Sequence, residues 1–176
     1  LDVFIFLCDK CKDKKTLVNF VRLYQSQQQT NISYNTVKRL NGNVAIITGG
    51  GKGIGYGIAQ AFAQEGANLV ITGRTESRLV AAKEKLEAEY GIEVLPIVAD
   101  GADEDAIKNV VAKTIERFGK ITTLVNNAQV SKSGLPLVEH SREDLDLAIY
   151  SGLYAAFFYM RECFPYLKES KGSVIN

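Results

Sequence analysis

The chain contains 176 residues, of which 46% are hydrophobic and 23% are charged. This is the composition of a globular protein, and the length suffices for one domain with its own core but not for two of ordinary size. The net charge of +1 hides an asymmetry, because residues 1–40 carry +4 (seven Lys and Arg against three Asp and Glu) and the rest carry −3 (fourteen against seventeen). An acidic body of this kind excludes nucleic acid as an expected partner.

Targeting and metal-binding patterns are weak. No stretch approaches the roughly 18 apolar residues that span a bilayer, so we expect no membrane partner. The apolar residues 3–8 are too few for the core of a signal peptide. Cysteines are few (Cys8, Cys11 and Cys163), which is typical of a reducing compartment and predicts a cytoplasmic location. The first two lack the second Cys pair or His cluster that a zinc site needs.

Residues 1–42 are predicted to form an N-terminal extension. They combine a lysine-rich stretch (10–15) with a glutamine cluster (25–29). Apolar residues at helical spacing favour one helix over residues 16–25. Because no second element is evident for this helix to pack on, the extension is expected to be disordered or loosely docked.

From residue 43 onward, short apolar stretches alternate with longer amphipathic ones. The first predicted helix places Ile54, Ile58, Ala61 and Phe62 on its buried face. Pro96 removes one backbone donor from the third predicted strand and is awkward in a central strand. The predicted strands cover residues 43–48, 68–72, 93–99, 121–127 and 172–176. The first predicted helix ends near residue 66, and the other three cover residues 76–90, 103–118 and 141–168.

This alternation predicts the fold class. Short apolar strands joined by amphipathic helices imply right-handed crossovers and a parallel sheet with both faces covered. We therefore expect an α/β, Rossmann-like doubly wound domain over residues 43–176, truncated in its fifth strand. Ligands of such sheets bind at the carboxyl ends of the strands.

The stretch IITGGGKGIGYG (residues 46–57) places six glycines in twelve residues between the first predicted strand and helix. Backbone N–H groups and the positive end of the helix converge there, and a pyrophosphate can approach only if side chains are absent. The alternative is a tight strand–helix turn that binds no ligand. The strand and helix context favours a dinucleotide site.

Three motifs occur in order at the ends of predicted strands: TGGGKGIG (48–55), VAD (98–100) and VNNA (125–128). Together they resemble the short-chain dehydrogenase/reductase family, whose signatures are TGxxxGIG, NNAG and an Asp that contacts adenine. The resemblance covers residues 43–176, the N-terminal part of such a domain. It implies a cofactor site that comprises Gly49, Gly51, Lys52, Gly53, Ile54, Gly55, Arg74, Asp100, Gly101, Asn127 and Ala128.

The residues after the second predicted strand bear on the choice of cofactor. An NAD site usually places an acidic residue there, about 20 residues past the glycines. Here Gly73 stands at that position and Arg74 follows. A guanidinium binds a 2′-phosphate that a carboxylate would repel, and Lys52 adds a second positive charge. The resemblance thus implies a preference for NADP(H), with NAD(H) as second choice; the alternative is that both cations are solvated surface charges.

The catalytic part of the family pattern is missing. The family uses a Tyr whose pKa is lowered by a Lys as general acid/base, with a Ser that binds the substrate oxygen. These positions would follow the fifth strand, beyond residue 176. The only Y-x-x-x-K, Tyr34 to Lys38, precedes the first strand and is interpreted as coincidence. Ser151 or Gly152 stands where the family has an Asn, and Gln129 replaces the Gly of NNAG.

The resemblance implies an NADP-dependent oxidoreductase that transfers hydride between nicotinamide and a small carbonyl or alcohol substrate. We expect the given chain to be an incomplete domain without catalytic residues and without activity alone. One alternative is a dinucleotide-binding module without activity, and another is a partner-binding N-terminal segment beside a vestigial site. His140 is interpreted as a surface residue. A homo-oligomer is expected if the domain is complete, and the candidate core or interface residues are Leu153, Phe157, Phe158 and Met160.

Overall fold

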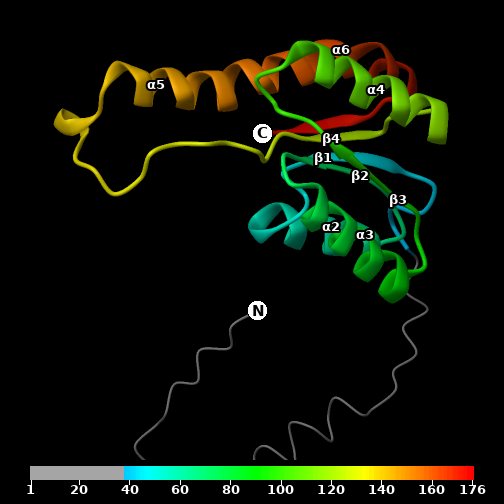
Figure 1. Cartoon of the computed structure of the whole chain (residues 1–176). Helices are drawn as coiled ribbons and strands as arrows, with labels where there is room; N and C mark the ends of the chain where they lie inside the picture. Colours follow the sequence, from blue (N-terminus) through cyan, green and yellow to red (C-terminus); the bar gives the residue numbers. More distant parts are fainter. Residues whose placement is uncertain (1–37) are drawn as a thin grey trace, which may run out of the picture. The chain divides into compact units, whose positions relative to one another are not determined.

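The computed structural model describes residues 38–176. The helix predicted at residues 16–25, Cys8, Cys11 and Tyr34 lie outside the described residues. Five strands form one sheet in the order β3-β2-β1-β4-β5, and every neighbouring pair is parallel (Figure 1). The elements in chain order are β1 (Val44–Thr48), α2 (Gly53–Gln64), β2 (Asn68–Gly73), α3 (Glu76–Tyr90), β3 (Val94–Val98), α4 (Glu104–Phe118), β4 (Thr123–Val125), α5 (Arg142–Ala148), a π-helical segment (Ile149–Tyr154), α6 (Ala155–Ser170) and β5 (Ser173–Ile175).

Helices cover both faces of this sheet. Figure 1 shows α2 and α3 on one face and α4 and α6 on the other. A hydrophobic core lies on each face of the sheet, and the side chains of β1 alternate between the two cores. Ala45 and Ile47 pack with α2 and α3, whereas Ile46 packs with α4 and α6. All three side chains are fully buried, as a strand covered on both faces requires. The predicted doubly wound α/β fold is confirmed.

The topology places a crevice beside β1. The chain adds β2 and β3 on one side of β1 and then crosses back to add β4 and β5 on the other. The connections after β1 and β4 therefore leave the sheet in opposite directions. Ligands of open α/β sheets bind in the crevice that such a reversal of strand order creates.

The buried face of α2 differs from the sequence prediction. Ile54 is 80% exposed, whereas the buried residues of this helix are Gly55, Ala59 and Ala63. These residues recur every four positions, so they form one stripe along the helix. Because their side chains are small, they permit a close approach to the sheet that an isoleucine would prevent. Of the four predicted residues, Ile58 and Phe62 are partly buried and pack against the core, whereas Ile54 and Ala61 are exposed.

Two other elements depart from their predicted form. Strand β4 is shorter than predicted at both ends, and just before its start Thr122 Oγ1 accepts the Val44 N–H at 3.0 Å. The helix predicted to run unbroken from Ser141 contains the π-helical segment Ile149–Tyr154 and continues to Ser170. Pro96 is accommodated because β3 is an edge strand of the described sheet.

Part of the predicted extension belongs to the described structure. Arg39 forms an ion pair with Glu65 at 2.9 Å, and the Leu40 N–H donates to the Glu65 carbonyl at 2.9 Å. The Leu40 side chain packs against the core beneath α2. Residues 38–42 are thus docked on the end of α2 and precede β1 as an ordered turn.

Candidate functional site

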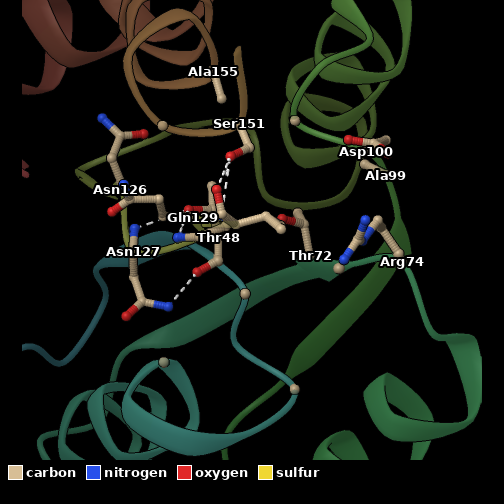
Figure 2. Close-up of a pocket in the computed structure, with 18 of the residues that line it drawn as sticks. Thr48, Thr72, Arg74, Ala99, Asp100, Asn126, Asn127, Gln129, Ser151 and Ala155 are labelled. Atoms are coloured by element: carbon tan, nitrogen blue, oxygen red, sulfur yellow. Dashed lines mark hydrogen bonds between the residues drawn. The ribbon is translucent and has the colours of Figure 1, made fainter. Parts of the chain in front are cut away.

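A cleft of about 1010 Å³ opens at the carboxyl ends of the strands (Figure 2). This volume is at the upper end of the range for small-molecule sites, about 300–1,000 Å³. Every residue that the resemblance assigned to a cofactor site lines this one cleft, although the residues come from four separate segments of the sequence. The segments are the β1–α2 turn (49–55), the end of β2 (Arg74), the end of β3 (100–101) and the end of β4 (127–128).

The N-terminus of α2 faces the cleft without a side-chain cap. The residue at the N-cap position is Lys52, and its side chain accepts no backbone N–H. By contrast, the Asp103 carboxylate caps α4 and accepts the N–H groups of Asp105 and Ala106 at 2.9 and 3.2 Å. The first N–H groups of a helix have no partner within the helix, and together with the helix dipole they bind anions. The start of α2 therefore presents an anion-binding surface.

The β1–α2 turn requires glycine at some positions because of a positive φ and at others because of close contacts. Gly49 has φ +70° and Gly53 has φ +56°, a region that favours glycine. A Cβ on Gly55 would overlap the Gly49 carbonyl oxygen and lie 2.6 Å from Asn127 Nδ2. By contrast, a Cβ on Gly53 would meet no atom within 4 Å. The turn is thus tight on its protein side and open towards the cleft, as the approach of a pyrophosphate requires.

Thr48 joins the turn to the end of β4. Its Oγ1 accepts the backbone N–H groups of Asn127 and Ala128, each at 2.9 Å. The Asn127 side chain donates in return to the Thr48 carbonyl at 2.9 Å (Figure 2). Because Thr48 is buried, water does not compete for these bonds. The sequence identified Thr48 only as part of a motif. Its hydrogen bond to Asn127, 79 residues away, follows only from the tertiary structure.

The cleft is positively charged near the end of β2. Lys52 and Arg74 line it, as does Arg78 in the first turn of α3. Among the described residues, neither Lys52 nor Arg74 forms an ion pair. Asp100 is the single carboxylate of the described lining. Arg78 was missed in the sequence analysis, and no helical spacing relates it to Arg74 because Arg74 precedes α3.

The end of β3 forms another wall of the cleft. Asp100 is exposed, and its Oδ1 accepts the Ala102 N–H at 3.0 Å in an Asx turn. Gly101 faces α6, where a Cβ on it would lie 3.0 Å from the Ala155 Cβ. The small residues at these two positions allow the β3–α4 turn to approach α6 closely.

A buried tyrosine also contributes to the cleft lining. Tyr159 is 2% exposed, and its hydroxyl lies 3.5 Å from Thr72 Oγ1. Burial raises the pKa of Tyr159 to about 12. A tyrosine that acts as general acid/base near neutrality needs a lowered pKa. Tyr159 packs within the core on the α4 and α6 side of the sheet, and it was not singled out in the sequence analysis.

The β4 side of the cleft is built by the loop after β4 and the π-helical segment. Ser151 Oγ accepts the Val130 N–H at 2.9 Å and lies 2.9 Å from the Val130 carbonyl and 2.7 Å from the Leu147 carbonyl. Gln129 lies between Ala128 and Val130, whose N–H groups donate to Thr48 and Ser151 respectively; the side chains of Thr48, Gln129 and Ser151 are labelled in Figure 2. Sequence reasoning identified Ser151 and Gln129 as departures from the family pattern but not the contacts that they make.

Other sequence candidates lie outside this cleft. His140 Nδ1 is 3.7 Å from Asp144 Oδ2, and His140 does not line the cleft. Within residues 38–176 no group of His, Cys, Asp and Glu is arranged to hold a metal ion, and no helix is long and apolar enough to cross a bilayer. The cleft therefore combines glycine-bordered N–H groups with cations, which suits a phosphorylated ligand of extended shape.

Comparison with known proteins agrees with this chemistry. A profile of the short chain dehydrogenase family matches residues 43–176. A 12alpha-hydroxysteroid dehydrogenase of a Clostridium species is 60% identical over 142 residues, which are 77% of this chain and 55% of the relative.

Solved structures show the same similarity. The L-sorbose reductase of Gluconobacter frateurii, complexed with NADPH and L-sorbose, has a TM-score of 0.73 at 32% identity, over 78% of this chain and 52% of that one. The alcohol dehydrogenase of Thermococcus sibiricus, complexed with 5-hydroxy-NADP, has a TM-score of 0.71 at 30% identity, over 75% and 56%.

The chain spans about half the length of these relatives. The match nevertheless includes every described strand and the whole cleft, which lies within residues 48–176. The chain belongs to the short-chain dehydrogenase family of oxidoreductases, whose members bind nicotinamide dinucleotides and act on small molecules.

Proposed function

We propose that this protein is an NADP(H)-dependent oxidoreductase that transfers hydride between the nicotinamide and a carbonyl or alcohol substrate. The observation that carries the cofactor preference is Arg74. It follows Gly73 at the end of β2, where an NAD site places an acidic residue, and it lines the cleft with Lys52 and Arg78. A bound nicotinamide dinucleotide supplies the hydride chemistry.

The residues of the cleft divide the binding task among them. The N–H groups at the start of α2, beside Gly49 and Gly53, bind the pyrophosphate. Arg74, with Lys52 and Arg78, binds the 2′-phosphate through charge-assisted hydrogen bonds. The remaining candidates are Asp100 and Gly101 for the adenine and Asn127 and Ala128 for the nicotinamide half.

The cofactor preference is tested by ligand titration of the Arg74→Ala variant. A hydrogen bond to a charged group contributes about 1.5–3 kcal/mol, so the Kd for NADPH should rise by about 10-fold or more while the Kd for NADH stays unchanged. Arg142→Ala is the matched control, because Arg142 is exposed on α5 and lies outside the cleft. Binding of NADH by the unmodified chain as tight as that of NADPH at low salt would contradict the proposal.

For the substrate we propose a hydroxysteroid. The support is the 60% identity to a relative named 12alpha-hydroxysteroid dehydrogenase, together with apolar Val130 and Leu153 in the cleft lining on the β4 side. The test measures the Kd of a 12α-hydroxysteroid for the chain in the presence of NADP, with a sugar alcohol as comparison. Tighter binding of the steroid supports this substrate class, and equal binding of both compounds contradicts it.

A dinucleotide-binding module without activity is the second candidate. Binding of NADPH without turnover of any carbonyl or alcohol would support this candidate. A cytoplasmic location and a homo-oligomeric state also belong to the proposal.

A further inference from the structure

Gln129 occupies the wall of the cleft at the position where the family motif has a glycine. Its side chain is exposed and lines the cleft. Its carboxamide makes no hydrogen bond to another residue of the described part, 38–176. A carboxamide has both donors and acceptors, so it can donate a hydrogen bond to a hydroxyl group or accept one from it.

The backbone of Gln129 is held from both sides. On one side, the Ala128 N–H donates to Thr48 Oγ1 at 2.9 Å. On the other, the Val130 N–H donates to Ser151 Oγ at 2.9 Å. The two hydroxyl groups belong to β1 and the π-helical segment, so the residue between them cannot shift without breaking one of these bonds.

The side chain of Gln129 is also supported. A Cβ on Gly152 would lie 3.4 Å from Gln129 Cγ and 3.5 Å from Cδ and Nε2. The glutamine thus rests against the glycine of the π-helical segment, where a larger residue would displace it. The contact with Gly152 limits the positions open to the carboxamide, whose polar atoms remain available to a ligand in the cleft.

The position of Gln129 indicates which half of a dinucleotide it meets. The cations that suit the 2′-phosphate of the adenosine half lie at the ends of β1 and β2. A dinucleotide lies across the crevice, with its pyrophosphate at the start of α2. Gln129 follows β4 on the other side of β1. It therefore lies on the side of the nicotinamide half.

We propose that the Gln129 carboxamide hydrogen-bonds the ribose hydroxyls of the nicotinamide half and is a binding residue for the cofactor. This inference rests on the proposed NADP(H)-binding function. A side chain in place of the motif glycine then adds a contact to the ligand instead of obstructing it, because Gly152 provides the space that the side chain needs.

The test titrates the full chain with NADPH and with 2′,5′-ADP, which contains the adenosine half only. Loss of one hydrogen bond raises a Kd by about 2- to 12-fold. In Gln129→Ala we expect a rise of this size for NADPH and no change for 2′,5′-ADP. Gln129→Met retains packing on Gly152 without the carboxamide and should behave like Gln129→Ala. Gln64→Ala, on the exposed end of α2 and outside the cleft, is the matched control.

The outcomes separate the two proposals. An unchanged NADPH Kd in Gln129→Ala, an equal rise for both ligands, or a wild-type NADPH Kd in Gln129→Met overturns the role of the carboxamide while leaving the cofactor site in place. Failure of the unmodified chain to bind either ligand overturns the proposed function and this inference with it. A rise confined to NADPH in both Gln129 variants supports the inference.

Discussion

At the scale of single residues, the site depends on backbone atoms that lie too close together for any side chain except hydrogen. Gly55 is the clearest case, because it lies between the Gly49 carbonyl and the Asn127 side chain. Asn127 in turn is bonded to Thr48. The glycine therefore belongs to the network that brings the ends of β1 and β4 together, in addition to leaving room for a ligand.

We predict that Gly55→Ala lowers the free energy of unfolding by about 1–3 kcal/mol, the usual cost of overpacking. NADPH binding should also weaken by more than 10-fold, because the β1–α2 turn must shift. Urea unfolding and NADPH titration measure the two effects. Gly57→Ala is the matched control: a Cβ there meets nothing within 4 Å, and alanine should stabilise the helix by about 1 kcal/mol. Equal behaviour of the two variants would contradict this account of Gly55.

At the scale of elements, α3 protects the outer edge of β3. Val94 lies in the edge strand, and its N–H donates to Glu87 at 2.9 Å while its carbonyl accepts Lys83 at 3.0 Å. Lys83 and Glu87 also form an ion pair at 3.0 Å. Two side chains of one helix thus satisfy backbone groups that β2 does not reach. Occupied edge groups of this kind also hinder pairing with another chain.

The same contacts predict a pH dependence. Burial opposes ionisation of Glu87, but the bonds from Val94 and Lys83 outweigh it and hold its pKa below the ordinary value of 4.5. A carboxyl with a lowered pKa in the folded state stabilises the protein above its unfolded pKa, and this contribution is lost as pH falls through the folded pKa. We therefore expect Glu87→Gln to reduce the loss of unfolding free energy below pH about 4.5.

Urea unfolding as a function of pH measures this effect. Glu84→Gln, at an exposed position of the same helix, serves as the control and should retain the pH profile of the unmodified chain. If the free energy of unfolding of Glu87→Gln fell with decreasing pH as steeply as that of the unmodified chain, Glu87 would contribute nothing to this pH dependence.

Element types were predictable from the sequence, whereas faces and interruptions were not. The strand–helix alternation after residue 43 identified each strand and most helices, because alternating apolar patterns reflect local geometry. The buried face of α2 was assigned only in part: Ile58 and Phe62 pack against the core, but the buried positions are Gly55, Ala59 and Ala63, because close packing on the sheet selects small residues. The π-helical segment Ile149–Tyr154 has no periodic pattern that would predict it. Within this segment, Ser151 Oγ accepts the N–H of Val130, which lies in the loop after β4.

At the scale of the whole described unit, residues 38–176, one helical face is apolar and exposed. Tyr150, Tyr154, Phe157 and Phe164 are between 42% and 62% exposed. Tyr150 and Tyr154 stack with ring centroids 5.1 Å apart. Of the residues expected at a core or interface, Met160 and Phe158 pack against the core, whereas Leu153 and Phe157 are exposed. Exposed apolar patches of this kind mark interaction surfaces.

We predict that this face mediates self-association, in keeping with the proposed homo-oligomer. Phe164→Glu should shift the sedimentation profile towards the monomer, because a carboxylate buried in an apolar interface carries a large desolvation cost. Lys113→Glu, at an exposed position of α4, is the control and should leave the profile unchanged. A profile that Phe164→Glu does not alter would exclude this face as the contact.

The sequence by itself determined the fold class, the order of the elements, the family and the segments that line the cleft. These features are local, because a strand, a helix or a glycine turn is encoded within a few consecutive residues. Only the tertiary structure decided which groups meet: Thr48 with the end of β4, Arg78 beside Arg74, and Gln129 against Gly152. Such contacts join residues distant in sequence, or depend on how a helix is oriented against the sheet. No short stretch of sequence therefore records them.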